Sequence, residues 1–272
     1  MTTSSETPTQ SDRSASSARR FRGLRRMLGC LALLTLTGLA QATELVRIAA
    51  AADLRYALDE IIELYRSENP EANLQVVYGS SGKMTTQIIN GAPYDLFFSA
   101  DISFPEKLKD EGLTATEPAV YAIGRIVLWS NTLDAGALTL VDLASDSITR
   151  IAIAQPAHAP YGLRAQEAMQ AAGVWEAVQR KLVFAENIAH AAQMTQSGAA
   201  QVGIIALSLA RFPDLATHDH HLIDDSLHNP LTQGFVVTRR GGNKPDALKF
   251  AEFMATEPAH AVMRRYGFVM PE

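Results

Sequence analysis

Four short segments rich in small, hydroxyl or proline residues stand where a predicted strand gives way to a predicted helix. They are Ala51-Ala52-Asp53, Gly79-Ser80-Ser81-Gly82, Pro160-Tyr161-Gly162 and Asn187-Ile188. The first N–H groups of a helix have no acceptor within the helix and lie at the positive end of its dipole. Because such a helix start readily binds an anion, the four segments could together hold one small oxyanion.

Ser81 is the sharpest single candidate, since its hydroxyl and its own N–H could both donate to one oxyanion. The alternative is that Ser80 or Ser81 only caps the following helix. Tyr161 lies between Pro160 and Gly162, and its phenol could also donate to an anion. The alternative for this tyrosine is simple packing at a protein surface.

Asp53 fits an anion site less easily, because a carboxylate next to an anion is repelled by it. An aspartate at this place would be a good N-cap for the helix that follows. We therefore expect the backbone N–H of Asp53 to face the anion and its side chain to turn away.

Enzyme and metal sites are less well supported by the sequence. His158, His190 and Asp101 could accompany Ser81 in a catalytic triad, but the chain has no G-x-S-x-G motif. The run 218–221, which reads HDHH, resembles a metal site, yet no distant partner ligands stand out, and a solvated loop is the favoured interpretation. Walker and Rossmann glycine motifs are absent from the sequence. We predict no catalytic residues, no direct metal site and no cofactor.

Short apolar runs alternate with amphipathic segments, which indicates an α/β fold. The predicted strands are 45–50, 73–78, 96–99, 126–130, 151–154, 182–185, 202–206 and 234–238. The predicted helices are 54–66, 83–89, 104–111, 163–172, 174–179, 189–196, 246–255 and 258–266.

Two sets of such units favour two lobes, with the chain crossing between them at 121–125 and again at 233–237. The first lobe would comprise 43–122 plus 236–272, and the second 123–235. Two crossings would form a two-strand hinge suited to closure around a ligand. A single doubly wound sheet would give a similar pattern.

The first 42 residues have the features of a secretory signal peptide. A cluster of arginines precedes the apolar run 27–40, which ends in Ala40-Gln41-Ala42, a small-x-small cleavage pattern. An uncleaved anchor is the alternative, but the run is short for a membrane span. Cys30, the only cysteine, lies inside this run, so the exported chain would have no thiol or disulfide chemistry.

The charge balance argues against a nucleic-acid binder. The chain has 24 basic and 29 acidic residues, and the first 42 positions hold six of the arginines and two of the acids. The remainder therefore carries 18 basic and 27 acidic residues, a net charge of −9. Since a nucleic-acid partner needs a basic surface, an anion here must be held by local dipoles rather than by the overall field.

The sequence resembles the molybdate-binding proteins of ABC transporters, a branch of the type II periplasmic binding-protein fold. The similarity extends over nearly all of residues 44–271 and is strongest where the sequence reads AAAADL (49–54), GSSG (79–82), GAPYDLFFSAD (91–101), YAIG (121–124), APYG (159–162), AENI (185–188) and RYGF (265–268). The resemblance implies two lobes, each a mixed sheet flanked by helices, joined by a two-strand hinge.

The resemblance also implies a function and a set of site residues. Neutral donors from both lobes would hold the anion, and the corresponding positions here are Ala52, Asp53, Ser81, Tyr161 and Ile188. Two positions depart from the family: Asp53 stands where many members have Ser, Thr or Asn, and Ala206 where many have a ligand tyrosine. Tyr161 could supply the missing hydroxyl.

The implied protein is a monomeric, periplasmic solute-binding protein that delivers molybdate, and with it tungstate, to the membrane permease of an ABC importer. It would not be an enzyme. The alternatives are a binding protein for sulfate or phosphate, a hydrolase of phosphate or sulfate esters that uses Ser81, and a sensory domain of the same fold.

Overall fold

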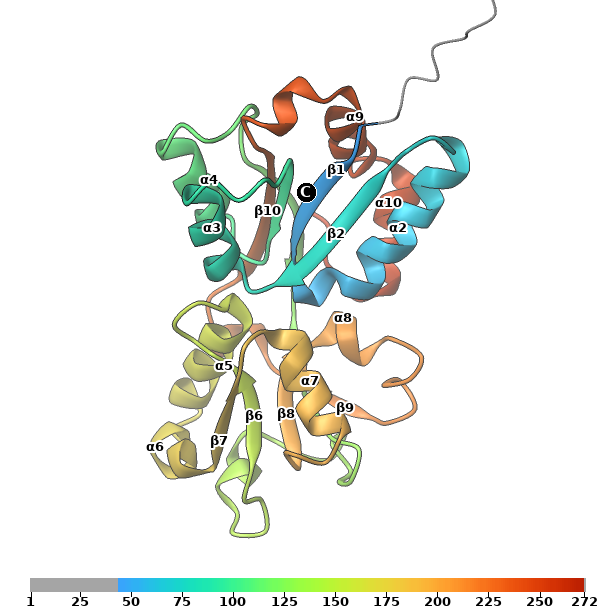
Figure 1. Ribbon diagram of the computed structural model, residues 1–272. Coiled ribbons are helices and arrows are strands. Elements are labelled where there is room, and N and C mark those ends of the chain that lie inside the picture. Colours follow the sequence, from blue (N-terminus) through green and yellow to red (C-terminus); the bar gives the residue numbers. More distant parts are fainter. Residues whose placement is uncertain (1–43, 272) are drawn as a thin grey trace, which may run out of the picture. The chain divides into compact units, whose positions relative to one another are not determined.

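A computed structural model describes residues 44–271, and the predicted signal peptide at 1–42 lies outside the described residues. The described chain contains two five-stranded sheets, each with helices packed around it (Figure 1). This α/β arrangement confirms the predicted fold class of two mixed sheets, and it excludes a single doubly wound sheet.

The sheet of the first lobe has the order β2-β1-β3-β10-β4. β1 pairs in parallel with β2 and β3, whereas β10 runs antiparallel to β3 and β4. The five strands are β1 (Val46–Ala51), β2 (Leu74–Gly79), β3 (Leu96–Ser99), β4 (Ala119–Gly124) and β10 (Leu231–Val237). β1 and β3 are almost entirely buried and apolar, as expected for central strands that are covered on both faces.

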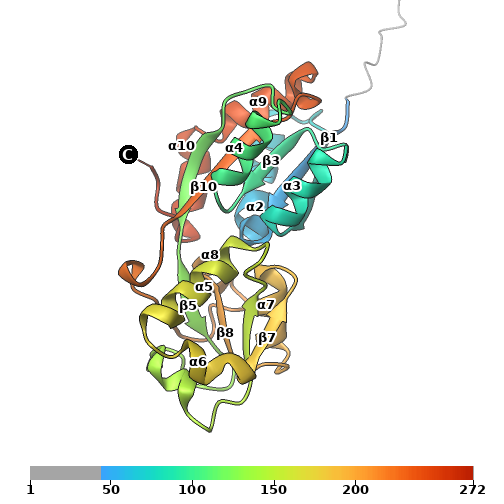
Figure 2. The ribbon, with the colours of Figure 1, turned by 90° about the vertical axis from the view of Figure 1, so that its left-hand side faces the viewer.

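Helices cover both faces of this sheet, as Figures 1 and 2 show. The helices of the first lobe are η1 (Ala52–Leu54), α2 (Arg55–Glu68), α3 (Ser81–Ile89), α4 (Ser103–Asp110), η5 (Gly241–Asn243), α9 (Pro245–Phe253) and α10 (Glu257–Arg265). α2 buries Leu58, Ile61 and Tyr65 on one face. This is the 3–4 spacing that predicted the helix from the sequence.

The sheet of the second lobe has the order β7-β6-β8-β5-β9. Its strands are β5 (Ile126–Trp129), β6 (Ile151–Ala154), β7 (Leu182–Ala185), β8 (Val202–Ala206) and β9 (His220–Leu222). Its helices are η2 (Val141–Ala144), α5 (Pro160–Ala171), α6 (Trp175–Val178), η3 (Gln179–Lys181), α7 (Ile188–Gln196), α8 (Leu207–Ala210) and η4 (Asp225–Leu227).

The chain crosses between the two sheets twice. β4 ends at Gly124 in the first sheet and β5 begins at Ile126 in the second, so the first crossing falls at Arg125. The return crossing lies between β9 and β10, and all of β10 pairs in the first sheet. The sequence-based boundary between 235 and 236 falls inside this strand. Residues 231–235 therefore belong with the first sheet.

Within residues 44–271, no helix combines the length and the apolar character that crossing a membrane requires.

Candidate functional site

The structure brings the five predicted site residues to the wall of one small cavity. Ala52, Asp53, Ser81, Tyr161 and Ile188 all line it, together with neighbouring small residues of the same segments. Ala52, Asp53 and Ser81 belong to the first lobe, whereas Tyr161 and Ile188 belong to the second. All five are at most 4% exposed. Their contact with an anion remains a prediction.

Ser81 is the first residue of α3 and is completely buried. Its Oγ accepts a hydrogen bond from the backbone N–H of Ala100, at 3.0 Å. Neither Ser80, at the N-cap position, nor Ser81 caps the helix with its side chain. Because a hydroxyl has one proton and two lone pairs, Ser81 still has its proton to donate. The capping alternative is therefore wrong for Ser81.

Two helices of the second lobe also begin at the cavity. α5 starts at Pro160, three residues earlier than predicted, so Tyr161 lies in its first turn rather than in a loop. Proline at this position suits a helix start, because its missing N–H would have had no acceptor there. α7 starts at Ile188, and the Oδ1 of Asn187 caps it by accepting from the N–H of His190, at 3.0 Å.

Asp53 does not cap a helix, contrary to the sequence-based expectation. It lies inside η1, and the N-cap positions of η1 and α2 are Ala51 and Leu54, neither with a side-chain cap. Its Oδ2 instead accepts hydrogen bonds from the phenol of Tyr161, at 3.0 Å, and from Nε2 of Gln233, at 2.8 Å. The side chain therefore joins the two lobes.

Burial raises the pKa of Asp53 from its usual value of 3.8 to about 6. The hydrogen bonds from Gln233 and Tyr161, and more weakly the backbone amides of Asp53 and Leu54, act in the opposite direction but do not offset the loss of solvation. Burial likewise holds the pKa of Tyr161 well above 10, so the phenol stays protonated. Asp53 is thus the one residue of the five that changes charge near neutral pH.

Sequence reasoning missed three residues that support this site. Tyr121 in β4 donates to Oε1 of Gln233 at 2.5 Å, and both side chains are buried. At Gly124, a Cβ atom would lie 2.3 Å from the Tyr161 hydroxyl and 2.5 Å from the Gln233 amide. Only a weak signal was present in the sequence: Gln233 lies between Leu231 and Phe235 in a predicted crossing segment, and a polar side chain that is buried there must be hydrogen bonded.

Further contacts hold the two lobes together around the cavity. The N–H of Gly82 donates to the carbonyl of His158 at 3.0 Å. Arg164 of α5 pairs with Asp101 of the first lobe at 3.1 Å. Lys83 pairs with Glu186 across the lobes, also at 3.1 Å, and the rings of Tyr56 and Phe212 stack with centroids 3.5 Å apart. The structure is therefore that of a closed two-lobed protein.

The catalytic triad that the sequence analysis considered, with Ser81 as its nucleophile, is not formed. The ring of His158 lies within hydrogen-bond distance of Ser80, with Nδ1 and Oγ 3.0 Å apart, whereas Ser81 bonds to a backbone amide. Asp101 is engaged by Arg164. Among residues 44–271, no group of three or more His, Cys, Asp or Glu side chains is placed to hold a metal ion. This stretch includes the run at 218–221, where His220 and His221 lie in strand β9.

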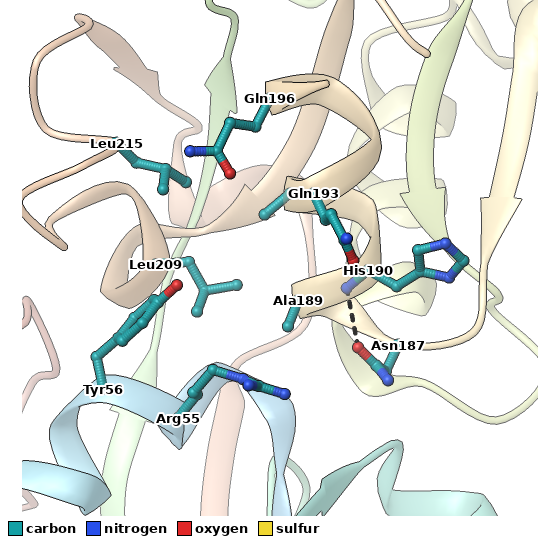
Figure 3. Close-up of a pocket in the computed structure, with 10 residues that line it drawn as sticks. Arg55, Tyr56, Asn187, Ala189, His190, Gln193, Gln196, Leu209 and Leu215 are labelled. Carbon is teal, nitrogen blue, oxygen red and sulfur yellow. Dashed lines mark hydrogen bonds between the residues drawn. The ribbon is translucent and has the colours of Figure 1, made fainter. Parts of the chain in front are cut away.

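A larger cavity of about 370 Å³ lies next to this site and was not foreseen from the sequence. Figure 3 shows Arg55 and Tyr56 of α2 on one side of it, with Asn187 and His190 of the second lobe on the other. The small cavity has a free volume of only about 10 Å³, roughly the room that one water molecule needs. In this arrangement of the lobes the small cavity has no room for an organic ligand, because sites for such ligands measure at least ~300 Å³.

Comparisons with known proteins agree with this architecture. The chain matches the family described as bacterial extracellular solute-binding protein over residues 46–269. It is 34% identical to the molybdate-binding protein ModA of Rhodobacter capsulatus over 248 residues, which is 89% of this chain and 95% of the relative. It is 32% identical to ModA of Azotobacter vinelandii over 251 residues, covering 90% of this chain and 97% of the relative.

Among solved structures, the periplasmic molybdate-binding protein of Azotobacter vinelandii superposes with a TM-score of 0.77 at 30% sequence identity. The match covers 84% of this chain and all of that protein.

Proposed function

Because the chain belongs to the bacterial extracellular solute-binding proteins, we propose that it captures molybdate and delivers it to the membrane permease of an ABC importer. Tungstate has the same shape and charge, so we propose that it binds as well. The protein would act in the periplasm as a monomer and would bind its ligand without converting it. The names of the relatives and the geometry of the small cavity support this proposal.

One observation carries the proposal: helix starts from both lobes meet at a single small cavity, and none of the described residues that line it is cationic. The hydroxyl proton of Ser81 and the N–H groups of Ser81 and Ile188, the first residues of α3 and α7, are neutral donors there. A fully ionised tetrahedral dianion needs only donors. Neutral donors at helix starts can hold it without a counter-charge.

The cavity is smaller than a tetrahedral anion, with about 10 Å³ free at its centre. Its donors are mounted on two lobes that are linked at a hinge, so the lobes can separate slightly and admit the ion when the contacts between them break. Selection against sulfate, which has the same shape but shorter bonds, would then depend on the spacing at which the two lobes hold their donors.

Calorimetric titration of the ligand-free protein with molybdate, tungstate, sulfate and phosphate tests the proposal. We expect one molybdate or tungstate per chain with nearly equal affinity, and much weaker binding of sulfate and phosphate. Preference for sulfate or phosphate would reassign the ligand within the same class of protein. Absence of binding by all four anions would refute the proposal.

The competing hypothesis is a hydrolase that uses Ser81 as its nucleophile. Such an enzyme requires a base beside the Ser81 hydroxyl. Neither candidate base among the described residues is hydrogen bonded to the Ser81 hydroxyl. His158 is hydrogen bonded to Ser80, and Asp53 accepts from Tyr161 and Gln233. Turnover of a phosphate or sulfate ester that is lost in Ser81→Ala, with no anion binding by the unaltered protein, would support the hydrolase.

A further inference from the structure

Asp53 is a buried acid in the wall of a cavity that we assign to a dianion. Its side chain is 1% exposed, and Oδ1 has no hydrogen-bond partner among residues 44–271. Buried polar atoms are nearly always hydrogen bonded, so an unpartnered carboxyl oxygen at a ligand site calls for an explanation.

Within residues 44–271, no cationic side chain is paired with the carboxyl of Asp53. The titratable groups that face it are the phenols of Tyr161, on α5, and Tyr121, on β4, and burial keeps both protonated. Ser208, on α8, donates to the backbone carbonyl of Asp53 and is neutral. The cation that is nearest along the chain, Arg55, lies over the ring of Tyr78 at 5.2 Å. A charged Asp53 would therefore face the dianion unscreened.

The hydrogen bonds around Asp53 distinguish its two oxygen atoms. Tyr121 donates to Oε1 of Gln233, which turns the NH₂ group of Gln233 toward Asp53. Nε2 then donates to Oδ2 of Asp53 at 2.8 Å and to the Tyr161 hydroxyl at 2.9 Å. The Tyr161 hydroxyl donates a hydrogen bond to the same Oδ2, at 3.0 Å. Oδ2 thus already accepts two hydrogen bonds. A neutral Asp53 would therefore carry its proton on Oδ1.

We propose that Asp53 binds the anion as a neutral carboxylic acid, donating the proton on Oδ1 to an anion oxygen. The protein would then take up one proton from solvent with each dianion that it captures. This inference rests on the proposed function and adds a specificity-determining donor to it. A carboxylic acid held neutral in a poorly solvated site can serve as such a donor.

The pKa of Asp53 in the ligand-free site supports this role. Burial already raises that pKa to about 6, so below neutral pH a part of the ligand-free protein still carries the proton on Asp53. A dianion in the cavity raises the pKa further, because it disfavours the charged form of its neighbour. Binding near neutral pH therefore draws a proton onto Asp53.

Calorimetry with sodium molybdate at about pH 7.5, in buffers of different ionisation enthalpy, measures the number of protons taken up. We expect close to one proton per anion for the unaltered protein and none for Asp53→Asn. The dissociation constant should weaken by up to roughly tenfold per pH unit above neutral pH in the unaltered protein. It should stay constant in Asp53→Asn, whose amide donates at every pH. Asp142→Asn, at an exposed carboxylate of the second lobe, is the matched control and should behave like the unaltered protein.

The outcomes separate this inference from the function on which it rests. Tight molybdate binding with no proton uptake and no pH dependence would overturn the role of Asp53 and leave the proposed function standing. Absence of molybdate binding at every pH would overturn both. The pH series on the unaltered protein does not depend on whether the variant folds.

Discussion

At the scale of single residues, Ser81 and Asp53 are the two side chains whose bonding decides how an anion is held. Ser81 accepts a bond from Ala100 N–H, and this fixes its oxygen and leaves its proton free to donate. Asp53 accepts from Tyr161 and Gln233 and so ties the site to both lobes. The sequence pointed to both residues, but it could not give the partners of Asp53, which are 108 and 180 positions away.

Replacing Ser81 with alanine should weaken molybdate binding by about 10- to 100-fold. The physical reason is the loss of one hydrogen bond to a charged ligand, which contributes about 1.5–3 kcal/mol. Titration calorimetry of both proteins checks this, with Ser67→Ala as a control at an exposed serine of α2. Equal affinity in Ser81→Ala and the unaltered protein would mean that the Ser81 hydroxyl serves only Ala100.

Asp53 should also make the stability of the ligand-free protein depend on pH. Its folded-state pKa is raised from 3.8 to about 6, so folding favours the neutral acid. The corresponding stability is fully present below the unfolded pKa and is lost as the pH rises through the folded one. The shift corresponds to about 3 kcal/mol at most.

Urea unfolding of Asp53→Asn and of the unaltered protein tests this linkage. The amide cannot ionise, so the stability of the variant relative to the unaltered protein should increase from about pH 4 to about pH 7 and then level off. A difference that stays the same across this range would show that Asp53 is solvated in the ligand-free protein.

At the scale of elements, several short buried strands could be predicted from the sequence, whereas the first residues of helices could not. Leu96–Ser99, Ile151–Ala154 and Leu182–Ala185 were predicted to the residue because each is a short apolar run. α3 and α5 begin earlier than predicted, because serine, glycine and proline, which are typical of turns, are also accepted in the first turn of a helix.

The strands near the hinge were the harder part of the fold. The predicted crossing at 121–125 consists largely of strand β4, which the sequence analysis did not predict, and β10 begins three residues before the predicted strand. Gln233 sits in β10 beside a shift of register, where pairing with β4 slips between Gln233 and Gly234. Such a bulge, which no local pattern predicts, aims a side chain at a functional site.

Gly124 at the end of β4 gives a test at this scale. A methyl group there would collide with the Tyr161 hydroxyl and the Gln233 amide, which are locked together in the closed protein. Overpacking of this kind costs about 1–3 kcal/mol, so Gly124→Ala should weaken molybdate binding by up to about 100-fold. Gly136→Ala, where the nearest atom lies 3.3 Å away, is the control. Undiminished binding in Gly124→Ala would show that the Tyr161–Gln233 contact does not matter for closure.

At the scale of the whole molecule, the two lobes meet around a site that neither completes alone. Ser81 and Asp53 come from one lobe and Tyr161 and Ile188 from the other. An anion that contacts both sets therefore binds the closed arrangement in preference to the open one, and it shifts the population toward closure. The fold and its ligand class could be predicted from the sequence, whereas the hydrogen bonds that join the lobes required the structure.

The overall charge predicts how salt affects the rate of anion capture. Residues after position 42 carry a net charge of −9, and the part of the chain that the structure describes places no cationic side chain in the lining of the small cavity. Screening should reduce the repulsion between protein and dianion, so the association rate constant should rise with ionic strength, by less than about tenfold. Stopped-flow fluorescence in increasing sodium chloride measures it. A steep fall with salt would mean that a cation such as Arg55 steers the anion instead.

The most direct test of the central claim is a crystal structure of the protein with molybdate, with the ion located by the anomalous scattering of molybdenum. We expect a single strong peak between η1, α3, α5 and α7, with anion oxygens about 2.7–3.1 Å from the Ser81 hydroxyl and the Ile188 N–H. The lobes should lie slightly further apart than in the structure described here. A peak in the larger cavity beside Arg55, or a cavity at Ser81 that stays empty when molybdate is bound elsewhere, would contradict the account.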